Sequence, residues 1–275
     1  MGKILQFKSC AVGGEFTKLG AQTPSSYGIC SVQSPANIVS HIASCYANDP
    51  NLAGKVTGIG YGWQQYTIPS SGNIKFTVRG GAGGSTGKNG YTIDPETGVV
   101  SGSGNRPGRG AKICGSAKLK KDDIIYILVG FRGWSNNGSD WGSCGGGASV
   151  VLLDNPSGQY TFGPLNRKVD VLFVAGGGGG CFDQSFGSAY YGGDAAFTDG
   201  INTNGGSNSG RSPGSGAGLT GNGTTEAHGH IAYSLLSGSV YGNYLNTAHG
   251  STWGGGGASC NGGGRRTEDT LVALL

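Results

Sequence analysis

The sequence has few charged residues and no long apolar run. Asp, Glu, Lys and Arg make up 12% of the chain, hydrophobic residues make up 36%, and the formal net charge is only +4. Because disordered chains combine low hydrophobicity with high net charge, this composition favours a folded protein. The sequence contains no stretch of about 20 apolar residues, so we expect no insertion into a membrane. The charges are scattered, and we expect no nucleic-acid partner.

Proline and paired cysteine motifs are also scarce. With nine Pro and no sustained Gly-X-Y register, the glycine-rich sequence is not typical of collagen. The seven Cys form no C-x-x-C pair, so nothing favours a zinc ribbon or a thioredoxin-like site. Because seven is odd, at least one thiol is free or pairs between chains. The others are either small apolar core residues or members of one or two disulfides.

Glycine is the residue type that the chain has in excess. It accounts for 59 of 275 residues, whereas average usage is about 7%. The segment "VDVLFVAGGGGGCF" shows the arrangement, because a strand-like run at 169–174 leads into five consecutive glycines at 176–180. Similar units recur without a fixed period. We therefore predict strands near 66–79, 124–129, 148–153 and 169–174, with glycine segments between and after them.

The first 62 residues differ from this pattern. Ser34 and Pro35 form a helix-start signature, and Ile38, Ile42 and Cys45 follow at helical spacing. We predict a short helix near 35–47 within an N-terminal attachment segment, 1–62, and a glycine-rich domain over 63–275. Within that domain, Tyr66–Ile68 and 73–79 are predicted to form a hairpin around the turn at 69–72.

Ordered glycine tracts need partners for their backbone groups. Polyproline-II geometry has no internal hydrogen bonds, but side-chain-free helices can pack side by side and bond to one another. Since ordering one residue costs about 1–2 kcal/mol and one hydrogen bond contributes about 1 kcal/mol, a lone glycine helix should not persist. We predict an all-β fold whose strands clamp a bundle of polyglycine-II helices. The lattice glycines would be Gly80, Gly81, Gly83, Gly84, Gly145, Gly146, Gly147, Gly176, Gly177, Gly178, Gly179, Gly180, Gly254, Gly255, Gly256 and Gly257.

Several motifs resemble one family. The segments "YTIPSSGNIKFTVRGGAGG", "GRGAKICGSAKLKKDDIIYILVGFRG", "GGGASVVLL", "DVLFVAGGGGG", "GGDAAF" and "STWGGGGASCNGGG" occur in the order found in the glycine-rich domain of anaplastic lymphoma kinase and leukocyte tyrosine kinase. The resemblance covers roughly 63–264. It implies a tumour-necrosis-factor-like β-sandwich that carries polyglycine helices. Adhesins at the tips of phage tail fibres are similar in using packed polyglycine helices.

Three non-enzymatic functions follow as hypotheses. The first is a phage tail-fibre or tail-tip adhesin, in which loops on the glycine lattice bind a host surface glycan or outer-membrane protein. The second is a purely structural virion protein, such as a capsid decoration, and the third is a receptor-type ectodomain that binds a small cytokine. We favour the adhesin, a virion protein assembled in the host cytoplasm, because the N-terminus has no signal-cleavage pattern. Residues 1–62 would attach it to other virion subunits or to further copies of itself.

Aromatic residues beside Asn, Ser and Asp suit sugar binding. They are alternatively a hydrophobic lid over the glycine helices. The candidate contacts are Trp134, Trp141, Tyr190, Tyr191, Tyr241 and Tyr244. We expect no catalytic site, metal or cofactor, because G-x-S-x-G matches at 83–87 and 210–214 lack the strand and helix that a nucleophile elbow needs.

Overall fold

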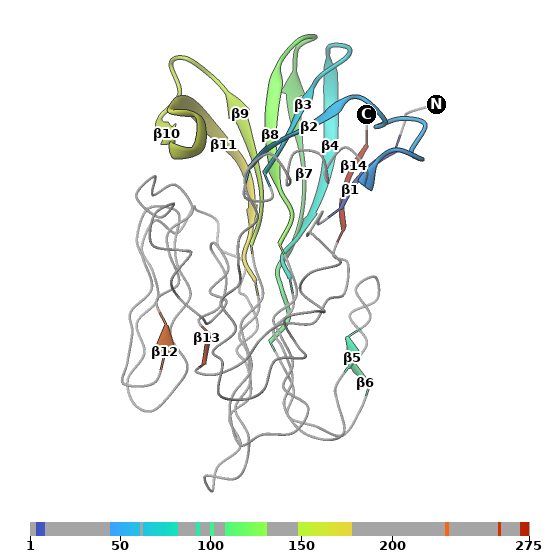
Figure 1. The fold of residues 1–275 in the computed structure, drawn as a ribbon, viewed down its shortest axis with the longest axis vertical. Helices are drawn as coiled ribbons and strands as arrows, with labels where there is room; N and C mark the ends of the chain where they lie inside the picture. Colours follow the sequence, from blue (N-terminus) through green and yellow to red (C-terminus); the bar gives the residue numbers. More distant parts are fainter. Residues whose placement is uncertain are drawn as a thin grey trace, which may run out of the picture.

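A computed structural model describes ten stretches of the chain. They are residues 4–8, 45–60, 63–81, 92–93, 100–101, 108–130, 148–177, 229–230, 258–259 and 270–274. Within them the secondary structure is almost entirely antiparallel β-strand, which confirms the predicted all-β class (Figure 1). In the described part of the chain, no helix is long and apolar enough to cross a membrane.

Two sheets make up most of this structure (Figure 1). The four-stranded sheet has the order β1 (Ile4–Lys8), β14 (Thr270–Leu274), β4 (Gly72–Arg79), β7 (Lys112–Leu119). The six-stranded sheet has the order β10 (Tyr160–Phe162), β11 (Arg167–Ala175), β9 (Ser149–Asp154), β8 (Ile124–Leu128), β3 (Trp63–Thr67), β2 (Val56–Gly60). A 3₁₀ turn, η1 (Gly163–Leu165), follows β10. Two short pairs complete the described strands: β5 (Thr92–Ile93) with β6 (Val100–Ser101), and β12 (Gly229–His230) with β13 (Ala258–Ser259).

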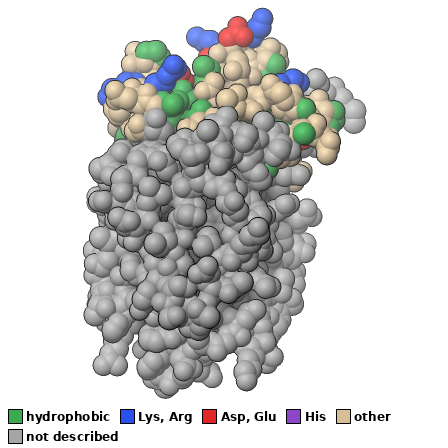
Figure 2. Space-filling view, in the orientation of Figure 1, with side chains coloured by type: hydrophobic (Ala, Val, Ile, Leu, Met, Phe, Trp, Pro, Cys, Tyr) green, Lys and Arg blue, Asp and Glu red, His purple; other side chains and the backbone are tan. Residues whose placement is uncertain are grey.

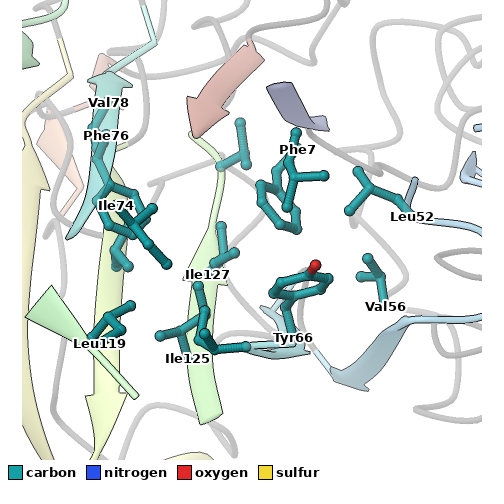
Figure 3. Packing of buried hydrophobic residues seen from close by; sticks show 14 of the residues in the cluster. Phe7, Leu52, Val56, Tyr66, Ile74, Phe76, Val78, Leu119, Ile125 and Ile127 are labelled. Atoms are coloured by element: carbon teal, nitrogen blue, oxygen red, sulfur yellow. The ribbon is translucent and has the colours of Figure 1, made fainter. Parts of the chain in front are cut away.

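The two main sheets share one hydrophobic cluster. Phe7, Ile74 and Phe76 of the four-stranded sheet belong to the same buried cluster as Tyr66 and Ile125 of the six-stranded sheet (Figure 3). The Phe7 and Tyr66 rings meet edge to face with centroids 5.5 Å apart. Alternation explains this arrangement in β4, where Ile74, Phe76 and Val78 are buried and the residues between them are not.

The N-terminal residues contribute to this cluster as well. Leu5 and Phe7 of β1, Tyr46, Leu52 and Val56 are all buried in it. The structure therefore brings described residues from both sides of the predicted boundary at residue 62 into one cluster. The predicted helix near 35–47 lies mostly outside the described residues, and Cys45 at its end is helical before a turn.

The six-stranded sheet is apolar on its other face too. Trp63, Tyr126, Leu152 and Phe162 are fully buried in a second cluster. The Phe162 ring lies 4.7 Å from that of Trp63 and 5.1 Å from that of Tyr126, measured between centroids. Because both faces are covered, β8 and β9 are continuous apolar runs rather than alternating ones.

Strand β11 leads directly into the five-glycine segment and carries an irregularity. Its register against β9 shifts between Val171 and Phe173. As a result Val171 packs on the second cluster, whereas Phe173 packs on the shared one. The Phe173 ring takes the space beside Gly115 of β7, where an added Cβ would lie 2.5 Å from the ring. A β-bulge therefore directs one aromatic side chain between the two sheets.

The predicted strands at 124–129, 148–153 and 169–174 are confirmed as β8, β9 and β11. The predicted hairpin over 66–79 is wrong. Strand β3 pairs with β2 and β8, whereas β4 pairs with β14 and β7, so the turn between β3 and β4 crosses from one sheet to the other. A turn sequence between two amphipathic strands does not reveal whether those strands pair with each other.

The β3–β4 connection, which crosses between the sheets, is stabilised by a second crossing connection beside it. The chain also changes sheets between β7 and β8, through a turn in which Asp122 has φ of 70°. Ile68 donates its N–H to the Asp123 carbonyl at 2.8 Å and accepts the Asp122 N–H at 2.8 Å. The Lys121 N–H donates to Ser71 Oγ at 2.8 Å. Each crossing thus supplies backbone partners for the other.

Candidate functional site

Three chain segments meet where the strands give way to glycine. We call Gly80, Gly110, Ala111 and Gly176 the glycine junction; they follow β4, precede β7 and follow β11. The Gly80 N–H donates to the Ala111 carbonyl at 2.9 Å, and the Ala111 N–H donates to the Gly176 carbonyl at 2.8 Å. The backbone hydrogen bonds of the junction therefore run between segments and link the two sheets.

The junction leaves no room for side chains at two positions. A Cβ added to Gly80 would lie 2.1 Å from the Gly176 carbonyl oxygen, and one added to Gly110 would lie 1.9 Å from the Gly80 carbonyl oxygen. These neighbours are backbone atoms that cannot rotate away. Gly80 thus contacts both other segments, and glycine is required here because the backbones approach so closely.

Ser149 supports the junction from the six-stranded sheet. Its side chain is fully buried, and its Oγ donates to the Arg79 carbonyl at the end of β4. The same Oγ accepts the Gly130 N–H at 2.9 Å. One hydroxyl therefore satisfies two backbone groups, one from each sheet.

Replacing Ser149 with Ala should destabilise the protein measurably. The substitution removes the acceptor of the buried Gly130 N–H, at about 1–3 kcal/mol for a buried group left unsatisfied, and it removes the hydroxyl that links this group to the Arg79 carbonyl. The free energy of unfolding, measured by urea titration, should fall by about 1–3 kcal/mol. Ser116→Ala, at an exposed position of β7, is the control and should change it by less than about 0.5 kcal/mol. Equal effects of the two substitutions would show that the Ser149 bridge has no energetic role.

The glycine junction lies at the end of the sheets from which four long segments leave. Residues 9–44 follow β1, 82–107 connect β4 to β7, 131–147 connect β8 to β9, and 178–269 connect β11 to β14. The registers Lys8↔Thr270, Arg79↔Lys112, Leu128↔Val150 and Ala175↔Ser149 place all of these departures at one end. We call it the glycine end.

The opposite end carries short turns and the chain ends. The β3–β4, β7–β8 and β9–β10 connections are there, and we call it the turn end. Ile4 pairs with Leu274, and Leu274 pairs with Lys75 near the start of β4, so β1 begins and β14 ends at this end. Figure 2 shows positively and negatively charged side chains together among the described residues at the turn end.

Asp154 is the centre of a small ionisable cluster near this end. Asp154 Oδ2 accepts from Arg167 Nη1 at 2.7 Å and from the Tyr126 hydroxyl at 3.2 Å. Burial, with a smaller contribution from the Asp154 charge, raises the pKa of Tyr126 to about 12. This keeps the Tyr126 hydroxyl protonated as a hydrogen-bond donor, so it is poorly suited to act as a base. Among the described residues, no cluster of His, Cys, Asp and Glu could hold a metal ion.

The structure brings some of the predicted lattice glycines together. Gly80 and Gly176 are in contact, and Gly81 and Gly177 follow them along the chain. Gly110 and Ser149 were not predicted, although the sequence "GRGAK" ahead of an alternating strand is a signal for Gly110. The remaining lattice glycines lie outside the described residues: Gly83, Gly84, Gly145, Gly146, Gly147, Gly178, Gly179, Gly180, Gly254, Gly255, Gly256 and Gly257.

All six predicted aromatic contacts also lie outside the described residues, so their roles stay predictions. Trp134 and Trp141 belong to segment 131–147, and Tyr190, Tyr191, Tyr241 and Tyr244 belong to segment 178–269. Cys45 and Cys114 are free thiols, which accounts for two of the seven cysteines.

No protein-family model matches the chain, and no curated protein matches its sequence. The resemblance to the glycine-rich receptor domain therefore rests on the motifs alone.

Proposed function

We propose that this protein is a host-recognition protein of a phage virion, a tail-fibre or tail-tip adhesin. In this proposal the two sheets form a β-sandwich that clamps packed polyglycine-II helices, and loops among those helices contact the host surface. The observation that carries the proposal is the division between the two ends of the sheets. Long segments leave the glycine end, whereas the turn end carries short turns and the chain ends. A rigid scaffold with variable segments at one end is a common design for binding proteins.

The glycine junction supports the clamp. Its three segments contact one another, bond through their backbones and exclude a Cβ at Gly80 and Gly110. A polyglycine-II lattice needs these same three properties. Anchoring its first residues in the sheets would offset part of the ordering cost of the glycines that follow.

The location of the aromatic residues supports recognition. Trp134 and Trp141 belong to one segment that leaves the glycine end, and Tyr190 and Tyr191 belong to another. Aromatic side chains beside polar residues combine large contact area with hydrogen bonding, which suits a sugar or an outer-membrane protein. Attachment through the terminal strands at the turn end would direct these segments away from the particle.

Binding to whole bacteria tests this function. Fluorescently labelled protein should bind particular strains in a panel and should block adsorption of the phage that infects those strains. Trp134→Ala/Trp141→Ala should weaken binding at least about tenfold. The control is Tyr160→Ala, which removes a half-buried aromatic residue near the turn end. This variant should bind as the unmodified chain does when both are assayed below their melting temperatures.

A structural virion protein would give the opposite result. It would be incorporated into particles but bind no strain in the panel, including strains that the phage infects. Binding that is unchanged in Trp134→Ala/Trp141→Ala would instead place the contact on another part of the chain.

A further inference from the structure

The charged residues on the outward side of β4 and β7 are all cations. Since Ile74, Phe76 and Val78 point into the core, Lys75 and Arg79 lie on the opposite face of β4. In β7 the corresponding outward residues include Lys112 and Lys118, which are both exposed. We call the outward residues of β4 and β7 the basic face. Its other members are uncharged: Asn73, Thr77, Cys114 and Ser116.

This face differs in charge from the other sheet. Strands β9 and β11 contain Asp154 and Asp170 as well as Arg167 and Lys168, and Asp154 forms an ion pair with Arg167 at 2.7 Å. No described residue of β4 or β7 is acidic. The small net charge of the whole chain therefore conceals a segregation of charge between the two sheets.

The registers define the spacing of the cations. Lys75 lies opposite Ser116 and Asn73 lies opposite Lys118, so Lys75 and Lys118 are diagonal neighbours, about 7–8 Å apart. Lys112 and Lys118 are six residues apart in one strand, which corresponds to about 20 Å. Arg79 lies directly opposite Lys112. The cations thus form an elongated stripe along the two strands.

Protection of a sheet edge does not explain this stripe. Lysines on an edge strand prevent unwanted strand pairing, and β7 is an edge strand. However, Lys75 and Arg79 belong to β4, which is paired on both sides by β14 and β7. Edge protection therefore accounts for the lysines of β7 but not for the cations of β4.

We propose that the basic face binds an anionic polysaccharide. Its alternation of lysines with the hydroxyl groups of Thr77 and Ser116 provides both charge and hydrogen bonds for an acidic, hydroxyl-rich chain. The described outward residues include no aromatic side chain on which nucleic-acid bases could stack. The outward residues of β4 and β7 include no large apolar side chain, but Val272 and Leu274 of the neighbouring β14 pair with Thr77 and Lys75. A lipid surface is therefore one of the outcomes that the test distinguishes.

This inference goes beyond the proposed function, because it places a contact on the sheet rather than on the long segments. It requires only the folded sheets. Binding of bacteria by the unmodified protein tests the adhesin proposal, whereas binding of a purified polyanion tests this one, so either can fail alone.

Fluorescence anisotropy with a labelled heparin hexasaccharide tests the basic face at about 0.15 M salt. The unmodified chain should bind, and Lys75→Gln/Lys118→Gln should weaken binding about tenfold or more. The matched control, Lys121→Gln/Lys168→Gln, removes the same charge from exposed positions outside the face and should change affinity by less than about twofold. Neutral dextran should not bind.

Cys114 provides a second measurement that needs no substitution. Its thiol is free, exposed and on the basic face, whereas the free Cys45 is half-buried. Saturating heparin should slow the alkylation of Cys114 several-fold and leave the alkylation rate of Cys45 unchanged. Peptide mass mapping measures both rates.

Four results would overturn the proposal. These are equal weakening by the two lysine pairs, absence of heparin binding, unchanged alkylation of Cys114 at saturation, or tighter binding of single-stranded DNA or phosphatidylglycerol vesicles through Lys75 and Lys118. The last result would assign the face to a nucleic acid or a membrane instead.

Discussion

Replacing Gly80 with Ala should lower the free energy of unfolding by at least about 3 kcal/mol. The new Cβ would lie 2.1 Å from the Gly176 carbonyl oxygen. Relief requires the two backbones to separate, and this would stretch the hydrogen bonds that Ala111 makes to Gly80 and to Gly176. Gly110→Ala should have an effect of the same size, because its Cβ would lie 1.9 Å from the Gly80 carbonyl oxygen.

The matched control for the junction is Gly72→Ala. Gly72 begins β4 at the turn end, and an added Cβ there would meet nothing within 4 Å. This substitution should leave stability unchanged or raise it by up to about 1 kcal/mol, because alanine reduces the freedom of the unfolded chain. Urea unfolding of the three variants measures the difference. If Gly80→Ala unfolds like Gly72→Ala, the close approach of the three segments is not a feature of the protein in solution.

Replacing Phe76 with Ala should cost about 3–5 kcal/mol. Its ring is fully buried and lies 5.1 Å, centroid to centroid, from that of Phe173. Since Phe76 belongs to the four-stranded sheet and Phe173 to the six-stranded sheet, the cavity would open between the sheets. Both sheets should therefore lose stability together.

Hydrogen exchange distinguishes a shared core from two independent ones. In Phe76→Ala, the amides of β9 should exchange faster by the same factor as those of β7. Lys75→Ala, at the adjacent position on the outward face, is the control and should change the free energy of unfolding by less than about 0.5 kcal/mol. Faster exchange in β7 alone would mean that the two sheets unfold separately.

Local patterns predicted individual strands well. The alternation in β4 and the apolar runs of β8 and β9 are visible in the sequence because burial on one or both faces dictates which residue types occur there. Strand β7 was missed even though it alternates, because Gly115 and Ala117 make its inward face look weakly apolar. Gly115 is small because the Phe173 ring occupies its space, and Phe173 belongs to a strand distant in the chain.

Partners of those strands could not be predicted in the same way. The turn sequence at 69–72 suggests a hairpin, yet it joins strands in different sheets, and the backbone partners of Ile68 before it are Asp122 and Asp123. The bulge at Val171–Phe173 is likewise invisible in an apolar run, because both adjacent faces accept large apolar side chains.

The sequence by itself determined the all-β class, the position of the main apolar strands and the placement of glycine directly after β4 and β11. These follow from local composition and periodicity. Only the tertiary structure decided which strands pair, that Gly110 joins Gly80 and Gly176, and that Ser149 bridges the two sheets. It also decided that Lys75 and Lys118 share one face. Each of these depends on backbone contacts between residues far apart in the chain, and a local pattern contains no record of such contacts.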